Sequence, residues 1–347
     1  MKTIAWNVTY ACNYRCEVCF TDAGEERKRE LNPREALAAV DSIAETGVRD
    51  VLISGGEPFM RKDLVQILTR MASHGIGARI ASNGSLLTEE LLAKLKRDTL
   101  TKSFQISLDT LDPSLYAKFH RCPAKMLNRA LSALDLIQSF GFHTTISVRS
   151  TQETLPGICG LLDLATERNW GTVTLHIPVQ TGRVEGLPDR EQDAVVQLEP
   201  VLSYFASLPK RWLAETYIPW AEYHPVFKAL SQKVEVVHRG CRAARDRLTI
   251  HPAGDIAPCI CMDLEEAYLG NVKRDSLSKV FEEHPKCQLM RAPWEHGVCS
   301  DCENVFRCGA GCRATALAFT GAFAGIDPQC PVRRANSVSR AVPERAG

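Results

Sequence analysis

Short apolar, β-branched runs alternate with longer amphipathic stretches along the first half of the chain. The runs are TIAWNVT (3–9), DVLISGG (50–56), GARIASNG (77–84), SFQISLDT (103–110), HTTISVRS (143–150) and TVTLHIP (172–178). The stretch between the first two begins at Pro33 and ends at Gly47, residue types that favour helix starts and helix ends. Six strand–helix units in series predict an α/β fold, a parallel sheet with right-handed crossovers that is either open or curled into a barrel.

The alternation stops after the sixth run. Pro178, Gly182, Gly186 and Pro188 interrupt it before an apolar-periodic stretch from about 190 to 207, and nine of the fourteen cysteines then fall between 241 and 330 in loop-like sequence. We therefore expect a core over 1–178, a bridging segment over 179–240, a cysteine-rich domain over 241–335 and a tail over 336–347.

Unusual polar clusters follow the predicted strands. They are the cysteines from 12 to 19, GGEP (55–58), SNG (82–84), LDT (108–110) and Arg149. Because functional groups collect at the carboxyl edge of a parallel sheet, these clusters are expected to share one face.

Charge and targeting signals narrow the class of protein. Lys and Arg number 42 against 41 Asp and Glu, so nothing indicates a nucleic-acid partner or an acidic tail. The start, MKTIAWNVTY, is no signal peptide, and no apolar stretch approaches a membrane span, so a cytoplasmic protein with no membrane partner is expected. In a reducing compartment, fourteen cysteines indicate metal ligands or reactive thiols rather than disulfides.

Two cysteine motifs have definite spacing. Cys12, Cys16 and Cys19 form C-x3-C-x2-C, and an isolated trio suggests either a distant fourth ligand or a metal left open on one side. The second motif is C-x2-C-x5-C-x3-C, formed by Cys299, Cys302, Cys308 and Cys312. Four thiolates suit zinc and iron–sulfur clusters alike, and a zinc ribbon is the alternative. The surplus of cysteines nearby, Cys241, Cys259, Cys261 and Cys330, favours iron–sulfur clusters.

The N-terminal motif, with Val18 and Phe20 around its third cysteine and SGGEP at 54–58, resembles the radical S-adenosylmethionine (SAM) superfamily. The C-terminal cysteines resemble its SPASM extension. The resemblance implies a partial (β/α)6 barrel with a C-terminal SPASM domain. It also implies a four-iron four-sulfur cluster on the cysteine trio, whose open iron binds SAM and yields a 5′-deoxyadenosyl radical. The cofactor-binding residues that it implies are Phe20, Gly55, Gly56, Glu57, Asn83, Ser107 and Arg121, although Asn83 and Gly84 could equally form a turn that ends a strand.

The same resemblance implies one or two auxiliary iron–sulfur clusters. One would be held by Cys299, Cys302, Cys308 and Cys330. The other would be held by Cys241, Cys259 and Cys312, and it either has an open site, takes Cys261 as a fourth ligand, or is smaller or absent.

Several residues remain as further candidates. Cys122 could donate a hydrogen atom or contact substrate, and Asp263 could act as a general base. Arg149 could contact the cofactor or solvate a strand end. Cys159 and Cys287 are expected to be small buried apolar residues.

The implied function is radical oxidation or cross-linking of a C–H position on a ribosomally made peptide or protein. Alternatives are tetrapyrrole side-chain modification or other cofactor maturation, a sugar epimerase or dehydrogenase, and a non-catalytic iron–sulfur electron-transfer protein. A flavodoxin or ferredoxin-type reductant is the expected partner. Because the first strand begins by residue 3 or 4, a peptide substrate would need a separate leader-binding protein or would be gripped by the barrel mouth and the bridge.

Overall fold

The computed structural model describes residues 1–25, 29–176, 179, 181–184, 200–201, 203–204, 207, 214–216, 236–237, 241–328 and 330. Most of the predicted bridging segment 179–240 and the whole tail 336–347 lie outside these residues. Within them, no helix is long and apolar enough to cross a membrane.

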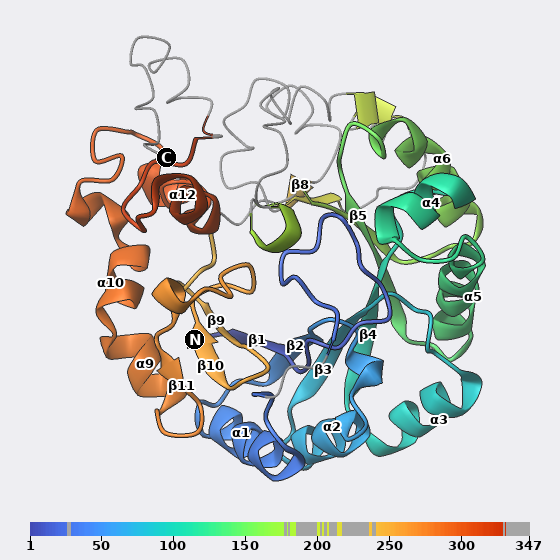
Figure 1. Ribbon diagram of the computed structural model, residues 1–347, viewed down its shortest axis with the longest axis horizontal. Coiled ribbons are helices and arrows are strands. Elements are labelled where there is room, and N and C mark those ends of the chain that lie inside the picture. Colours follow the sequence, from blue (N-terminus) through green and yellow to red (C-terminus); the bar gives the residue numbers. More distant parts are fainter. Residues whose placement is uncertain are drawn as a thin grey trace.

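All six predicted strands form and pair in parallel in chain order. They are β1 (Thr3–Asn7), β2 (Asp50–Ser54), β3 (Gly77–Ser82), β4 (Thr101–Ser107), β5 (His143–Arg149) and β6 (Thr172–His176). Figure 1 shows the helices around the outside of the curved sheet and the loop after β1 in the middle. The predicted partial barrel is confirmed.

The helices between these strands are α1 (Pro33–Glu45), α2 (Leu64–Ser73), α3 (Glu89–Asp98), α4 (Pro113–His120), α5 (Met126–Ser139) and α6 (Leu155–Glu167). Helix α1 begins and ends where the sequence predicts. The Asn32 side chain accepts from Glu35 N and the Glu35 side chain accepts from Asn32 N, each at 3.0 Å, which forms a capping box. Gly47 follows the helix with a φ of +73°, which glycine adopts without strain.

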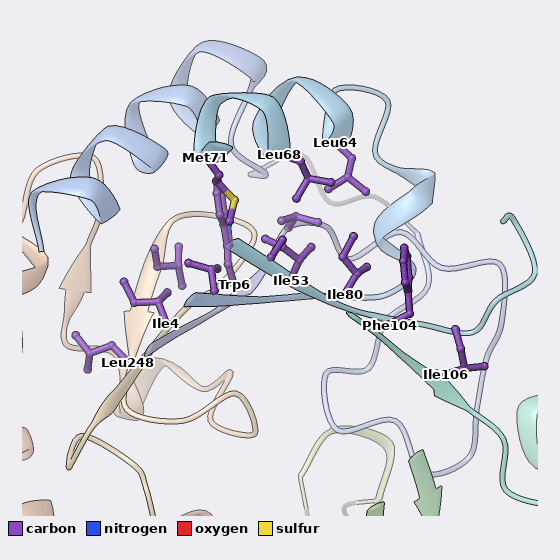
Figure 2. Packing of buried hydrophobic residues seen from close by; sticks show 14 of the residues in the cluster. Ile4, Trp6, Ile53, Leu64, Leu68, Met71, Ile80, Phe104, Ile106 and Leu248 are labelled. Carbon is purple, nitrogen blue, oxygen red and sulfur yellow. The ribbon is translucent and has the colours of Figure 1, made fainter. Parts of the chain in front are cut away.

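The core lies between the sheet and its covering helices. Figure 2 shows Leu64, Leu68 and Met71 of α2 pointing at side chains of the sheet that include Ile53 and Ile80. All five are buried. Burial of such a side chain stabilises the fold by roughly 1.5–3 kcal/mol.

The sheet extends beyond the six predicted strands at both edges. Beyond β6 lie β7 (Ala214–Thr216) and β8 (Val236–Val237), both parallel. At the other edge β9 (Arg247–Ile250) pairs in parallel with β1, and β10 (Asp255–Ala257) and β11 (Gly270–Asn271) follow in antiparallel pairing. The expectation of loop-like sequence after residue 241 is therefore wrong for this part, and the cysteine-rich region shares one sheet with the barrel.

Short helices carry the rest of the C-terminal region. They are α9 (Leu277–Glu283), α10 (Pro285–Arg291), α11 (Val305–Cys308) and α12 (Arg313–Thr320), with single turns η4 (Glu265–Ala267) and η5 (Pro293–His296). The fully buried Arg313 side chain donates to the carbonyl oxygens of Phe323 (2.9 Å) and Gly325 (2.7 Å). The Arg313 guanidinium therefore fixes the loop that follows α12.

Candidate active site

Cys12, Cys16 and Cys19 lie on the loop that follows β1, at the carboxyl edge of the sheet. The loop closes on itself, because Cys12 N donates to Gly24 O (2.7 Å) and Gly24 N donates to Tyr10 O (2.8 Å). The backbone therefore holds the three thiols on one compact segment, which we call the cysteine loop (residues 8–25).

Each sulfur of the cysteine loop has a polar neighbour. Cys12 Sγ accepts from Tyr14 N and Cys19 Sγ accepts from Ala23 N, both at 3.4 Å, while Cys16 Sγ lies 3.2 Å from His120 Nδ1. Burial raises the pKa of Cys12 to about 11 and that of Cys16 to about 12. A metal that binds here therefore has to displace protons from these thiols.

Gly55 and Gly56 pack against the backbone of the cysteine loop. Gly56 N donates to Thr9 O and the next amide, Glu57 N, donates to Ala11 O, both at 2.8 Å. A Cβ on Gly56 would lie 2.2 Å from Ala11 O, and one on Gly55 would lie 2.5 Å from Thr9 O. The structure thus shows why both positions need glycine, which is that the loop approaches too closely to leave room for a Cβ.

Glu57 and Asn83 connect the ends of β2 and β3 to the cysteine loop. The fully buried Glu57 carboxylate accepts from Ser82 Oγ (2.9 Å), Asn83 N (2.8 Å) and Phe59 N (3.2 Å), and Glu57 caps the single turn η1 (Pro58–Met60). Burial raises its pKa to about 7. Asn83 Nδ2 donates to Asn13 Oδ1 at 2.9 Å. Contact of either residue with the cofactor stays a prediction.

A buried charge cluster lies beside the cysteines. Asp109 is fully buried; its Oδ1 accepts from Arg149 N, and its Oδ2 lies 3.1 Å from His120 Nε2 and 3.6 Å from Arg149 Nη1. Burial alone would raise the pKa of Asp109, but His120 and Arg149 outweigh it and hold the pKa below its usual value. The sequence left the role of Arg149 open. In the structure its side chain is only 20% exposed and interacts electrostatically with Cys16 and Cys19.

The remaining predicted barrel residues differ in their surroundings. Arg121 ends α4 with a φ of +46°, and its side chain is 57% exposed and lies 3.7 Å from Glu17 Oε1. Ser107 is the half-buried last residue of β4. Cys122 is half-buried beside the Tyr14 hydroxyl, and burial raises its pKa to about 11. Arg149 thus interacts with Cys16 and Cys19, whereas the Arg121 side chain is mostly exposed beside Glu17, and the assignment of Arg121 to the cofactor stays a prediction.

Arg183 holds the cysteine loop from outside the barrel core, and the sequence analysis missed it. From the single turn η2 (Gly182–Val184), its Nε donates to Cys16 O (2.8 Å), its Nη1 to Asp22 Oδ1 (2.7 Å) and Ala23 O (2.8 Å), and its amide to Cys19 O (2.9 Å). These partners lie about 160 residues away in sequence. No local pattern could have indicated the contact.

A pocket of about 340 Å³ joins the cysteine loop to the C-terminal region. Residues 20–22, residues 181–183, Asp263 and Leu264 line it. Phe20 and Asp263, two predicted site residues, are thus brought together. Asp263 Oδ1 accepts from the hydroxyls of Tyr268 (2.7 Å) and Tyr10 (3.2 Å), so its carboxylate is held in place at the pocket.

The C-terminal cysteines gather in two groups. In one, the Cys259 and Cys261 thiols lie close enough to shift each other's pKa, Cys261 also interacts with Cys312, and Cys312 interacts with Cys241. The other group contains Cys308, which interacts with Cys299 and Cys330, and Cys302, whose amide donates to Cys299 O (2.9 Å). Burial raises the pKa of Cys308 and of Cys312 to about 12.

The two other cysteines differ from this pattern. Cys287 is fully buried on α10, as predicted, whereas Cys159 is only half-buried on α6. Across the described part of the chain, no three His, Cys, Asp or Glu side chains are close enough to hold a single metal ion. Sets made only of thiolates suit iron–sulfur clusters, in which each thiolate binds its own iron.

The donor set of the cysteine loop fits an anionic cluster. Three thiols lie on one short loop, and the Arg149 guanidinium, which pairs with Asp109, also interacts electrostatically with Cys16 and Cys19. A parallel α/β barrel with three thiols after its first strand, joined through its sheet to a domain with further cysteine groups, has the thiol sets that an iron–sulfur enzyme requires.

Comparison with known families identifies the class of iron–sulfur enzyme to which the chain belongs. The model of the radical SAM superfamily matches residues 6–155, and that of the SPASM iron–sulfur cluster-binding domain matches residues 241–303. The chain belongs to the radical SAM superfamily and carries a C-terminal SPASM domain. Its cofactors are SAM, a four-iron four-sulfur cluster and auxiliary iron–sulfur clusters.

Individual relatives cover nearly the whole chain. The AdoMet-dependent heme synthase of Oleidesulfovibrio alaskensis is 26% identical over an alignment of 347 positions that covers 95% of this chain and 87% of that protein. The mycofactocin maturase MftC of Mycolicibacterium smegmatis is 26% identical over an alignment of 330 positions that covers 94% of this chain and 82% of that protein. Streptococcus suis SuiB, solved with its precursor peptide SuiA, matches with a TM-score of 0.75 at 20% identity, covering 95% of this chain and 75% of that chain. The last likeness supports the fold.

Proposed function

We propose that this enzyme oxidises or cross-links a C–H position on a ribosomally made peptide or protein. The observation that carries the proposal is the pocket between the cysteine loop and Asp263. Its volume of about 340 Å³ lies within the range of ligand pockets, so it can admit an amino-acid side chain. Similarity to the maturase MftC supports the same substrate class.

The residues proposed to hold the cofactors belong to the cysteine loop and to the ends of the neighbouring strands and helices. We propose that Cys12, Cys16 and Cys19 ligate the SAM-binding cluster, which supplies reductive cleavage of SAM and a radical that abstracts hydrogen from substrate. Arg183 fixes the loop that carries these ligands, and Arg149 offsets their negative charge. The cofactor contacts are proposed to come from Phe20, Gly55, Gly56, Glu57, Asn83, Ser107 and Arg121.

Two residues are proposed to move hydrogen. Asp263 lines the pocket and two tyrosine hydroxyls orient its carboxylate, so it can accept a proton from a substrate held there. Cys122 has a raised pKa, so it keeps its S–H hydrogen near neutral pH, as a hydrogen donor requires. Unchanged products from Cys122→Ala would remove that role.

We propose two auxiliary clusters with four thiolates each. One set is Cys299, Cys302, Cys308 and Cys330, and the other is Cys241, Cys259, Cys261 and Cys312. The thiol contact between Cys259 and Cys261 supports Cys261 as the fourth ligand. Cys261→Ser should therefore change the spectrum or iron content of one auxiliary cluster, whereas the control Cys159→Ser on α6 should change neither. Identical iron content and Mössbauer spectra in both variants would contradict the assignment.

Modification of a tetrapyrrole is the second candidate, because the heme synthase relatives cover 95% of this chain. The two candidates are separated by incubating the anaerobically reconstituted enzyme, SAM and a low-potential reductant with each substrate class. One substrate is a short peptide encoded beside the gene, and the other is an iron tetrapyrrole with propionate side chains. Mass spectrometry should find two hydrogens lost from the peptide. Loss of carbon dioxide from the tetrapyrrole, with the peptide unchanged, would reverse the assignment.

The proposed reductant, location and partner protein follow from the chemistry of SAM cleavage and from the proposed peptide substrate. Reductive cleavage needs a low-potential electron, so a flavodoxin or ferredoxin-type reductant in the cytoplasm is the proposed partner. A separate leader-binding protein is proposed for a peptide substrate. Turnover with a purified flavodoxin and its reductase in place of a chemical reductant tests the first of these.

A further inference from the structure

Cys16 differs from the other two cysteines of the cysteine loop in what its sulfur faces. The sulfurs of Cys12 and Cys19 accept from backbone amides, whereas Cys16 Sγ lies 3.2 Å from the Nδ1 atom of His120. An imidazole beside a metal-binding sulfur can stabilise negative charge on that sulfur, because its hydrogen bond strengthens as the sulfur becomes more negative.

The surroundings of His120 leave its ring little freedom. It lies at the end of α4, is fully buried, and packs between the rings of Tyr14, Tyr116 and Phe119 at centroid distances of 5.9, 4.2 and 5.4 Å. On its far side, Nε2 lies 3.1 Å from Asp109 Oδ2, a short but bent contact that acts through charge more than through a well-directed hydrogen bond. The ring is thus held between Cys16 and a buried carboxylate.

The chemistry of Cys16 and Asp109 decides whether Nδ1 of His120 donates or accepts a hydrogen bond. A cysteine sulfur that ligates iron carries no hydrogen, so the hydrogen in the contact with Cys16 has to lie on Nδ1. Asp109 is an acceptor as well, because Arg149 also stabilises its ionised form. Nδ1 therefore donates to Cys16, while Nε2 faces the Asp109 carboxylate at 3.1 Å without a well-directed hydrogen bond.

We propose that His120 is a positioning residue that donates a hydrogen bond from Nδ1 to the sulfur of Cys16, is oriented by Asp109, and raises the reduction potential of the N-terminal cluster. This rests on the proposed function only in that Cys16 is a cluster ligand. The direction follows from electrostatics: reduction adds negative charge to the cluster, and a donor at the ligand sulfur stabilises the more negative state.

The test is a potentiometric titration of the full-length, anaerobically reconstituted protein, followed by electron paramagnetic resonance. The N-terminal cluster is recognised as the signal that changes when SAM is added. His120→Leu removes the donor at similar volume, and His120→Asn keeps an N–H near the position of Nδ1. Tyr116→Phe is the control, since it alters the packing around the ring and leaves the contact with Cys16 in place.

We expect His120→Leu to lower the equilibrium constant for reduction roughly tenfold, which is about 59 mV for a one-electron couple. His120→Asn should recover part of the loss, and Tyr116→Phe should match the wild type. A potential in His120→Leu that equals the wild type, with iron content intact, overturns the proposal. An asparagine variant that falls as far as the leucine variant does so too.

Two further outcomes also decide the role of His120. If His120→Leu does not assemble the cluster, Asp109→Asn replaces it, since this change keeps the ring and removes the carboxylate charge; an unchanged potential there overturns the proposal. If the wild type gives no signal that responds to SAM, the cluster assignment of the proposed function has failed, and the inference about His120 falls with it.

Discussion

Replacement of Gly56 by alanine tests the packing of the cysteine loop against the end of β2. A Cβ at this position would lie 2.2 Å from Ala11 O, 2.7 Å from Ala11 C and 2.8 Å from Tyr10 O, all of them backbone atoms. Since ordinary contacts begin at 3.4 Å, the loop would have to move away by more than 1 Å. No side chain can rotate to relieve the clash.

The magnitude can be worked from the contacts that such a shift disturbs. Overpacking of this kind costs about 1–3 kcal/mol. The two hydrogen bonds from Gly56 N and Glu57 N to the loop, both 2.8 Å long, contribute roughly 1 kcal/mol each. The loop conformation that brings the three thiols together should therefore lose about 3–5 kcal/mol relative to other conformations.

The assay is iron and sulfide content after anaerobic reconstitution, together with the signal that responds to SAM. Gly56→Ala should lose the N-terminal cluster and keep the C-terminal iron. The control is Gly160→Ala, at an exposed position of α6 where a new Cβ would meet nothing within 4 Å. Alanine there should be neutral or stabilise the helix by up to about 1 kcal/mol.

The opposite result would refute the reasoning. If Gly56→Ala binds the N-terminal cluster and cleaves SAM as the wild type does, the loop does not need its close contact with β2. If Gly160→Ala loses iron as well, the effect is a general loss of folding, and the steric argument is not the cause.

Three other predictions follow from the site. Burial raises the pKa of Glu57 from 4.5 to about 7, so its protonated form contributes roughly 3 kcal/mol of stability below pH 4.5, and this is lost as pH rises through 7. Urea midpoints of the apo wild type should thus fall more between pH 5 and 8 than those of Glu57→Gln; parallel profiles would contradict the pKa. Arg183→Met removes the side-chain bonds to Cys16 O and Ala23 O, so chelators should strip iron from the N-terminal cluster faster, whereas the control Arg168→Met, at an exposed ion pair, should behave as the wild type. Alanine at any one of the three loop cysteines should abolish SAM cleavage while iron remains in the C-terminal clusters; cleavage that survives would refute the ligand assignment.

Local signals in the sequence determined much of this protein. The six barrel strands and helix α1 were predictable because β-branched runs, an N1 proline and a C-terminal glycine act over a few residues. The spacing of Cys12, Cys16 and Cys19 places three thiols on one short loop in any fold that puts a strand before them. The class of cofactor could therefore be predicted before the fold was known.

Short strands were harder to predict. β9, β10 and β11 contain four, three and two residues, too few for a periodic pattern to stand out. β9 pairs with β1, almost 250 residues earlier in the chain, and β10 and β11 in turn pair outward from β9. No local pattern indicates that the cysteine-rich region shares this sheet with the barrel.

The tertiary structure alone decided which charged groups surround the cysteines. Arg121 and Arg149 are the same residue type, yet Arg121 ends helix α4 with an exposed side chain beside Glu17, whereas Arg149 ends β5 with a side chain only 20% exposed beside Asp109. His120 carries no motif of its own and meets Cys16 across 104 residues. Thus the sequence by itself determined the strands and placed three thiols on one short loop. The charged and aromatic groups around those thiols were decided by tertiary structure, because burial and long-range contact depend on which segments meet in the folded chain.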